Sequence, residues 1–239
     1  MSLNGKRVVL FGGTSGIGLA TAVASARAGA EVVVVSSRQS SVDTALAELP
    51  TGAEGHVVDL TDHGALEAFF DAAAPFDHLV ITAGEGLRSM PLAEYDATAA
   101  REFFELRFFT ALQAIHLASP ILRQGGSIVL TSGTAAFRPA AGWTLGSAIC
   151  NAVIGATKAL AVELAPIRVN AVAPGIVRSP LWAAMSADDQ AQMYAAQAAS
   201  IPAGRVAETS DVAQAYVALM ESDFVTGTIS VVDGGTILV

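Results

Sequence analysis

The glycine-rich stretch within residues 7–18 constrains the fold more than any other part of the sequence. An apolar, β-type run ends at Gly12, and a helical pattern begins at about Gly16. Glycines let the backbone approach a phosphate closely, and the N–H groups and dipole at the start of a helix attract negative charge. The spacing Gly12-x-x-x-Gly16-x-Gly18 therefore predicts an anion site, although a tight strand-to-helix connection without a ligand would also explain it.

Strand-like and helix-like segments alternate along the rest of the chain. Further β-type runs cover residues 31–36, 55–59, 77–82, 126–132, 167–173 and 228–232. Helical patterns cover residues 16–27, 42–49, 61–73, 97–122, 145–164, 180–200 and 209–220. The run at 31–36 contains four consecutive valines, which is typical of a parallel strand buried on both faces. The alternation predicts an α/β fold: a three-layer, doubly wound, parallel seven-stranded sheet of the Rossmann type. We expect a single domain over residues 1–239, with a substrate lid around 180–200.

Composition limits the environment and the partners of the chain. Its 239 residues are 52% hydrophobic and 15% charged, which argues against disorder and for a sizeable core. The net charge of −9, without a basic run, gives no sign of nucleic-acid binding. The sequence has no apolar run of about 18 residues and no signal-peptide pattern, so no membrane contact is expected. The single cysteine indicates a cytoplasmic protein without internal disulfides, and the four histidines lack the spacing of metal ligands.

Ligands of doubly wound sheets bind beyond the carboxyl ends of the strands. The motifs at these ends resemble those of the short-chain dehydrogenase/reductase family, over essentially the whole chain. Residues 11–18 look like the family's TGxxxGIG turn, with Phe11 where threonine is usual. Residues 82–84 resemble the tail of its NNAG segment, residues 174–179 its PGxVxT motif, and residues 227–235 its C-terminal TG…VDGG motif. The resemblance implies a bound nicotinamide dinucleotide and a hydride-transfer reaction.

The resemblance also implies which residues hold the dinucleotide. They belong to the glycine turn, the end of the second strand, an adenine-contacting pair, and the NNAG-like and PGxVxT-like segments: Gly12, Thr14, Ser15, Gly16, Ile17, Gly18, Ser37, Arg38, Asp59, Leu60, Ala83, Gly84, Pro174, Gly175, Val177 and Ser179. A carboxylate after the second strand would favour NAD, whereas an arginine favours the 2′-phosphate of NADP. Ser37 and Arg38 stand there, so NADP(H) is favoured and NAD(H) is the runner-up. A solvated arginine at a helix start is the alternative explanation.

The catalytic set implied by the family is missing. The family uses a tyrosine as general acid/base and a lysine four residues later, which lowers the tyrosine pKa and holds the ribose. A serine binds the substrate oxygen, and an asparagine on the preceding long helix anchors a water relay. Here the tyrosine position falls on Gly146, the lysine on Cys150, the serine on Gly133 beside Ser132, and the asparagine near Arg107. General acid–base catalysis typically contributes about 10²–10⁴-fold, so the chain is a slow enzyme, a differently arranged one, or none.

Two residues are candidates for an altered catalytic site. Ser132 ends the fifth strand, where a carbonyl oxygen would sit, although a serine there can instead cap the backbone. Arg107 could polarise a carbonyl or hold a carboxylate, although a salt bridge to Glu163 or another acid would also explain it. Less direct candidates are Trp143 as a pocket wall and Trp182 as a residue of the lid, with core packing as the alternative for each. Tyr194 either enters the site or packs, His116 is expected to be exposed or at an interface, and Cys150 is expected to be a small buried hydrophobe.

The sequence thus predicts an NADP(H)-dependent oxidoreductase that transfers a hydride to or from a small carbonyl or alcohol. The alternative is a catalytically silent dinucleotide-binding protein, such as a redox sensor or a structural partner. Loop 85–95 and segment 180–200 are expected to shape the pocket for a small-molecule substrate. The apolar helices 97–122 and 145–164 correspond to those that pair subunits in the family, so we expect a homodimer or homotetramer.

Overall fold

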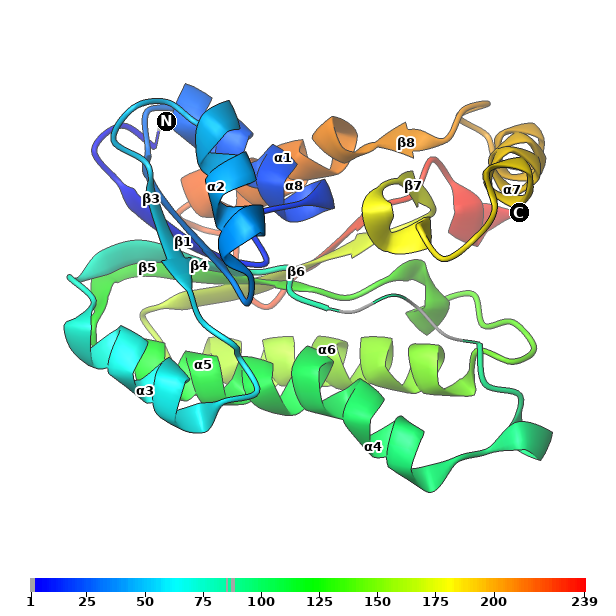
Figure 1. Cartoon of the computed structure of the whole chain (residues 1–239), viewed down its shortest axis with the longest axis horizontal. Helices are drawn as coiled ribbons and strands as arrows, with labels where there is room; N and C mark the ends of the chain where they lie inside the picture. The colour runs from blue at the N-terminus through cyan, green and yellow to red at the C-terminus, as the bar shows by residue number, and fades with distance from the viewer. Residues whose placement is uncertain (1–2, 85, 87–88) are drawn as a thin grey trace.

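The computed structural model describes residues 3–84, 86 and 89–239, and its centre is a parallel seven-stranded sheet (Figure 1). The strand order is β3-β2-β1-β4-β5-β6-β9. These strands are β1 (Arg7–Phe11), β2 (Glu31–Ser36), β3 (Glu54–Val57), β4 (Phe76–Ile81), β5 (Leu122–Thr131), β6 (Arg168–Pro174) and β9 (Ile229–Val232). A separate pair is formed by β7 (Val177–Arg178) and β8 (Ala207–Glu208).

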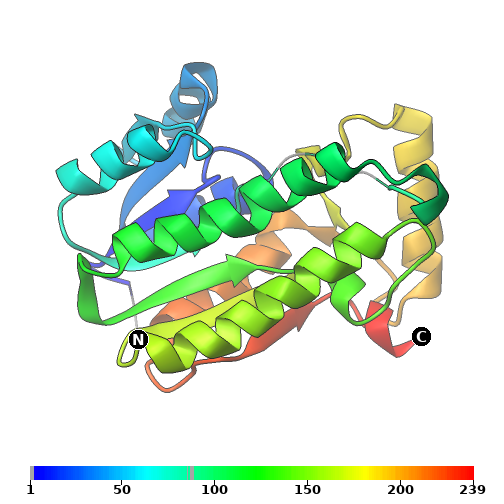
Figure 2. The same ribbon diagram turned by 90° about the horizontal axis from the view of Figure 1, so that it is seen from below.

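Helices cover both faces of the sheet and make the three layers of the predicted Rossmann-type fold (Figure 1). One layer holds α1 (Gly16–Arg27), α2 (Gln39–Glu48) and α8 (Thr209–Glu221). The other holds α3 (His63–Ala72), α4 (Ala97–Phe104), η2 (Glu105–Phe109), α5 (Thr110–Ala118) and α6 (Thr144–Glu163). Seen from below in Figure 2, the green α4–α5 run and the yellow-green α6 lie side by side across the sheet. The predicted doubly wound architecture is therefore confirmed.

The sheet buries both of its faces, and each face has its own hydrophobic cluster. Leu10 and Val34 are fully buried on the α1 and α8 side, where Tyr216 joins them. Phe11 and Leu79 are fully buried on the α3 and α5 side. Successive residues of a strand point to opposite faces, so each strand needs an apolar residue at nearly every position. This explains why the valine run of β2 is continuous.

The helix expected over residues 97–122 differs from the prediction in two ways. It is interrupted by the π-helical turn η2, which carries Arg107 between α4 and α5. It also ends at Ala118, and Leu122 already begins β5. Pro120 accounts for this end, because proline has no N–H group to continue the helical hydrogen bonds; Ser119 before it still has helical backbone.

Segment 180–200 is also divided rather than uniformly helical. A short helix, η4 (Pro180–Trp182), precedes α7 (Ala187–Ser200), and the Ser186 side chain caps α7 by accepting a hydrogen bond from Asp189 N (3.1 Å). Helix α2 begins directly after Arg38, three residues earlier than expected. Within the predicted pocket loop 85–95, positions 85, 87 and 88 lie outside the described residues, and η1 (Leu92–Glu94) is a short helix.

A charged cluster at the amino ends of the central strands holds β1, β4 and β5 in register. The Asp77 side chain is only 6% exposed, and its carboxylate accepts hydrogen bonds from Lys6 Nζ (3.0 Å) and Arg123 Nη1 (2.7 Å). It also accepts the backbone N–H of Arg7 (2.9 Å). Burial raises the pKa of Asp77, but these three hydrogen bonds act in the opposite direction and hold the pKa below its ordinary value. The cluster therefore lies at the end of the sheet opposite the carboxyl ends of the strands.

Candidate active site

The glycine turn after β1 has the backbone geometry of an anion cradle. Gly12 and Gly16 have φ angles of 82° and 53°, in the left-handed region that favours glycine. A Cβ at Gly12 would lie 2.6 Å from Ala83 N, so the turn packs directly on the segment after β4. Thr82 Oγ1 fixes this contact by donating to the carbonyls of Phe11 and Gly12, each at 3.2 Å.

The start of α1 fits a phosphate group. Its N-cap residue, Ser15, has extended backbone, and its side chain makes no capping hydrogen bond. The backbone N–H groups of the first turn and the helix dipole therefore face the cavity without a side-chain acceptor at the cap. An anionic ligand satisfies such groups. The residues present at this turn therefore fit the pyrophosphate of a dinucleotide.

Arg38 lies at the next strand end, as the N-cap residue of α2. A cation at a helix start is disfavoured by the helix dipole. The Arg38 side chain is exposed, and among the described residues no carboxylate forms a salt bridge with it. An arginine with this placement fits a phosphate better than a structural ion pair.

A cavity of about 700 Å³ joins these elements to the ends of β4, β5 and β6. Twelve of the predicted cofactor residues line it, together with both candidate catalytic residues: Gly12, Ser15, Gly16, Ile17, Gly18, Arg38, Ala83, Gly84, Pro174, Gly175, Val177, Ser179, Ser132 and Arg107. Its volume lies in the usual range of ligand pockets, about 300–1,000 Å³. The carboxyl ends of five strands therefore share one site.

Four predicted cofactor residues are not part of the cavity lining. Thr14 and Leu60 are buried in the fold, with 8% and 9% exposure. Ser37 is exposed. Asp59 Oδ1 accepts hydrogen bonds from Thr61 N (2.9 Å) and Thr61 Oγ1 (2.7 Å), which lower the pKa of that carboxyl. Their contact with a cofactor stays a prediction.

Ser132 connects the end of β5 to α6. Its Oγ donates a hydrogen bond to the backbone carbonyl of Cys150 (3.0 Å), and its N–H donates to Val172 O (2.8 Å). The backbone-capping role considered from the sequence is therefore present. A Cβ at Gly133 would lie 3.2 Å from Cys150 Sγ. Gly133, at the family's serine position, therefore packs against Cys150, at its lysine position. Cys150, expected to be a small buried hydrophobe, is half-buried and lines the cavity.

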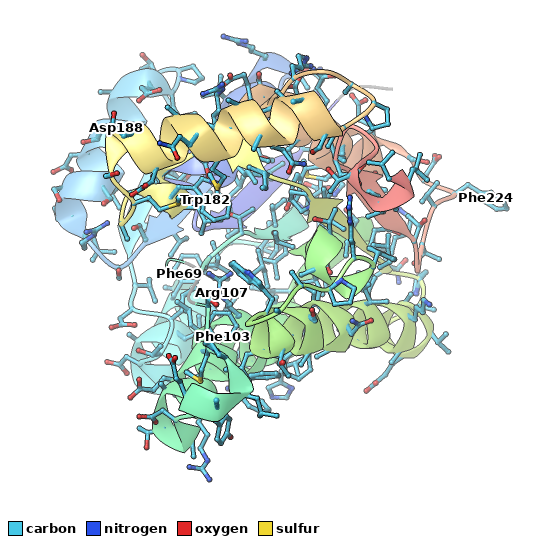
Figure 3. The ribbon with its side chains drawn as sticks, turned by 90° about the vertical axis from the view of Figure 1, so that its right-hand side faces the viewer. Phe69, Phe103, Arg107, Trp182, Asp188 and Phe224 are labelled. Atoms are coloured by element: carbon cyan, nitrogen blue, oxygen red, sulfur yellow. The ribbon has the colours of Figure 1, made fainter. Side chains whose placement is uncertain are left out.

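Arg107 reaches the same region from η2, which lies beside α6 in the same helical layer. Its guanidinium lies over the Phe103 ring, 5.2 Å from the ring centroid, and a Cβ at Gly84 would lie 2.7 Å from Nη1. In Figure 3 it projects from the α4–α5 run toward the space beneath Trp182. Burial raises the pKa of the Cys150 thiol, and the positive charge of Arg107 acts against that rise. Arg107, Ser132 and Cys150 therefore form one cluster.

The position of the family's tyrosine is covered by an indole ring. Gly146 is buried in the first turn of α6, and a Cβ there would lie 3.0 Å from Trp143 Cε3. Trp182 borders the cavity as well, and its Nε1 donates to Val177 O (3.0 Å). The pocket-wall interpretation of Trp143 is supported by this placement. Tyr194 is packed at 7% exposure against Arg178, and His116 is exposed, as expected.

Three further lining residues were not identified from the sequence. Arg138 Nη1 donates to Thr236 O (2.6 Å), and Gln197 Nε2 donates to Thr236 Oγ1 (2.8 Å). All three border the cavity and bring the loop after β5, α7 and the C-terminal segment together. In the sequence, the glycine pair Gly234–Gly235 marks the turn by which the chain returns, and Gly235 adopts a φ of 90° there.

The described residues also bear on metal binding and on membrane insertion. They contain no group of three or more histidine, cysteine, aspartate or glutamate side chains arranged to hold a metal ion. One described helix, α6, is long and apolar enough to cross a membrane by length and composition alone, with a mean hydropathy of 1.5. Core helices of soluble proteins meet the same criterion.

Comparisons with known proteins agree with the site. The model of the enoyl-(acyl carrier protein) reductase family matches residues 12–236. The short-chain dehydrogenase/reductase ATR9 of Stachybotrys chlorohalonatus is 37% identical, over 99% of each chain. A small-chain dehydrogenase solved with NADPH is 33% identical, with a TM-score of 0.83 over 99% of this chain and all of that one. An NADPH-bound short-chain oxidoreductase of Pseudomonas aeruginosa, described as containing an atypical catalytic centre, is 31% identical, with a TM-score of 0.89 over 97% of this chain and 96% of that one.

These similarities extend over nearly the full length of the chain and support NAD(P)-dependent oxidoreductase activity. Relatives of this kind act on small molecules. Together with the sheet order, the glycine turn and the cavity at the strand ends, they assign the chain: it belongs to the short-chain dehydrogenase/reductase family.

Proposed function

We propose that this protein is an NADP(H)-dependent oxidoreductase that transfers a hydride to or from a small carbonyl or alcohol substrate. One observation carries the proposal. A single cavity combines the start of α1 with Arg38 on one side and the ends of β5 and β6 on the other. When bound, the nicotinamide supplies or accepts the hydride. The protein binds, orients and shields the reacting groups.

The preference for NADP(H) over NAD(H) rests on Arg38. Its guanidinium offers a planar set of donors that suits a 2′-phosphate, and a hydrogen bond to a charged group contributes about 1.5–3 kcal/mol. Arg38→Ala is therefore expected to weaken NADPH binding by about 10- to 100-fold and to leave NADH binding nearly unchanged. Calorimetric titration measures both constants. Arg101→Ala removes an exposed arginine of α4 outside the cavity lining and is the matched control. Equal loss of NADPH and NADH affinity would refute the role of Arg38.

On the substrate side, Ser132 is the candidate that binds the reacting oxygen. Its hydroxyl donates to Cys150 O in the structure, so it has to rotate in order to donate to a substrate. Arg107 adds positive charge to the same part of the cavity. With Gly146 and Cys150 at the tyrosine and lysine positions, the proton comes from water or from a residue of segment 180–200, which acts as a lid. Trp182, Met193 and Gln197 of that segment border the cavity.

The alternative is a catalytically silent dinucleotide-binding protein. The absence of a tyrosine and a lysine at positions 146 and 150 favours it. The two proposals separate when NADPH binding and NADPH oxidation are measured side by side with a broad panel of carbonyl compounds. Tight binding with no turnover supports the silent protein and contradicts the enzyme. If neither NADPH nor NADH binds, both proposals are wrong.

We also propose that the protein works in the cytoplasm as a homodimer or homotetramer, without nucleic-acid or membrane partners. Phe109 in η2 and Val162 in α6 are 52% and 80% exposed, on the helices that are expected to pair subunits. A partner subunit would cover this apolar surface. Size-exclusion chromatography with light scattering at micromolar concentration tests it, and a monomer would contradict it.

A further inference from the structure

Arg107 has a place in the site that its position in the sequence does not explain. It belongs to the helical layer of α4 and α5, yet its guanidinium lies at the carboxyl end of β4 against Gly84. The π-helical turn η2 contains it, and such turns occur frequently at functional sites. The Phe103 ring beneath the guanidinium supports its position. The chain therefore delivers a fixed positive charge to one strand end.

The strand order predicts which part of a dinucleotide lies at that strand end. The pyrophosphate belongs at the start of α1, directly after β1, and Arg38 after β2 is the proposed contact of the adenosine 2′-phosphate. The other half of the dinucleotide must then extend in the opposite direction, over β4 and β5. Adjacent strands are about 4.8 Å apart. The sugar that follows the pyrophosphate on this side is therefore expected over the end of β4, beside Gly84.

Helix α6 borders the end of β4 on the other side, and it supplies no cation there. Position 150 of α6 is a cysteine, and a thiol carries no positive charge in either protonation state. Burial raises the pKa of this thiol, which favours its neutral form, and Arg107 lines the same cavity. No aspartate, glutamate or lysine is among the described residues that line the cavity, and its charged lining residues are Arg38, Arg107 and Arg138. Of these three, Arg107 is the one at the end of β4.

From this geometry we infer that Arg107 is a cofactor-positioning residue, which donates hydrogen bonds to the hydroxyl oxygens of the nicotinamide-side ribose. A guanidinium has five N–H donors in a planar fork, and the two neighbouring hydroxyl oxygens of a ribose each accept hydrogen bonds. The inference rests on the proposed dinucleotide-binding function. It assigns Arg107 to the cofactor rather than to the carboxylate or carbonyl of a substrate. In this chain the cation for the ribose comes from α4–α5 and not from α6.

The test uses ligands that keep or lack the ribose that Arg107 would contact. Calorimetry measures Kd for NADPH, for 2′-phospho-ADP-ribose, which keeps the second ribose, and for 2′-phospho-ADP, which keeps both phosphates and lacks that ribose. Arg107→Ala is expected to weaken the first two ligands by about 10- to 100-fold and to leave the third unchanged. Arg107→Lys keeps the charge and loses less affinity. The double variant Arg107→Ala, Cys150→Lys places a cation on α6 and is expected to recover most of the affinity for the first two ligands.

Three outcomes would overturn the inference. Unchanged NADPH affinity in Arg107→Ala, with a higher KM for the carbonyl substrate, assigns Arg107 to the substrate. Equal weakening of all three ligands indicates a distorted site, which circular dichroism and thermal unfolding of the same variants check independently. No recovery in the double variant shows that a cation at this point is not what the ribose requires. Failure of the wild-type protein to bind NADPH would instead refute the proposed function, so the two failures are distinguishable.

Discussion

A tyrosine at position 146, where the family has one, is expected to clash with Trp143. A Cβ at Gly146 would lie 3.0 Å from Trp143 Cε3, and a tyrosine ring must extend beyond that Cβ into the cavity. Forcing extra atoms into a packed site typically costs about 1–3 kcal/mol. Replacing a helical glycine returns up to about 1 kcal/mol. Gly146→Tyr is therefore expected to be neutral or to lower the free energy of unfolding by up to about 3 kcal/mol.

Removing the indole should reverse that cost. In a Trp143→Ala background the space beside position 146 is open, so Gly146→Tyr keeps the gain in helix propensity without the clash. The two substitutions are expected to couple by about 1–3 kcal/mol, the upper range for residues in contact. Urea unfolding of the wild type, the two single variants and the double variant measures this coupling. A coupling below about 0.5 kcal/mol would refute the steric argument, because independent sites add within that limit.

The same background also tests the chemistry of the site. With Trp143→Ala, Gly146→Tyr and Cys150→Lys combined, a general acid/base and its cation return to the family's positions. NADPH oxidation with carbonyl compounds should then rise toward the about 10²–10⁴-fold that such catalysis contributes. With Trp143 retained, the rise should be much smaller. An equal rise in both backgrounds would show that the indole does not obstruct the position.

The remaining predictions concern the two ends of the sheet. Asp77→Asn removes a carboxylate whose side chain is 6% exposed, while its partners Lys6 and Arg123 are 49% and 48% exposed. Because the partners are half exposed, we expect the free energy of unfolding at pH 7 to fall by the low end of the cost of breaking a buried ion pair, about 3 kcal/mol. Because the folded-state pKa of Asp77 is lowered, this stability is present above the unfolded value of about 3.9 and is lost as the pH falls through the folded pKa. Urea unfolding should therefore show the wild type and the variant converging in acid, and a constant difference would contradict this. Ser132→Ala should lower kcat/KM about 10²-fold with NADPH affinity unchanged, as for the loss of one oxyanion donor, and unchanged kinetics would limit Ser132 to its bond with Cys150 O.

The sheet and the cofactor turn were predictable because both depend on local sequence. The continuous apolar run of β2 identifies a buried parallel strand, and the Gly12–Gly18 spacing identifies the turn that packs on Ala83. Pro120 is a local signal for the earlier end of the helix expected over 97–122, although apolar residues continue on both sides of it.

The catalytic side was less predictable because its contacts are long-range. Nothing in the residues around Arg107 shows that a π-helical turn directs its guanidinium to Gly84. The sequence likewise shows a glycine at position 146, but not that an indole from the preceding turn covers it. Arg138 and Thr236 meet across 98 residues, and no local pattern encodes such a bond.

The placement of the two tryptophans has a practical consequence. The chain contains only Trp143 and Trp182, and both border the ligand cavity, one at the start of α6 and the other in η4. Essentially all indole emission of the protein therefore originates at the site, and reduced nicotinamide absorbs light in the range where indoles emit. The wild-type protein thus carries its own optical sensor for cofactor occupancy. Trp143→Phe and Trp182→Phe each leave a single emitter, so changes beside Gly146 and changes at η4 can be recorded separately when a ligand binds.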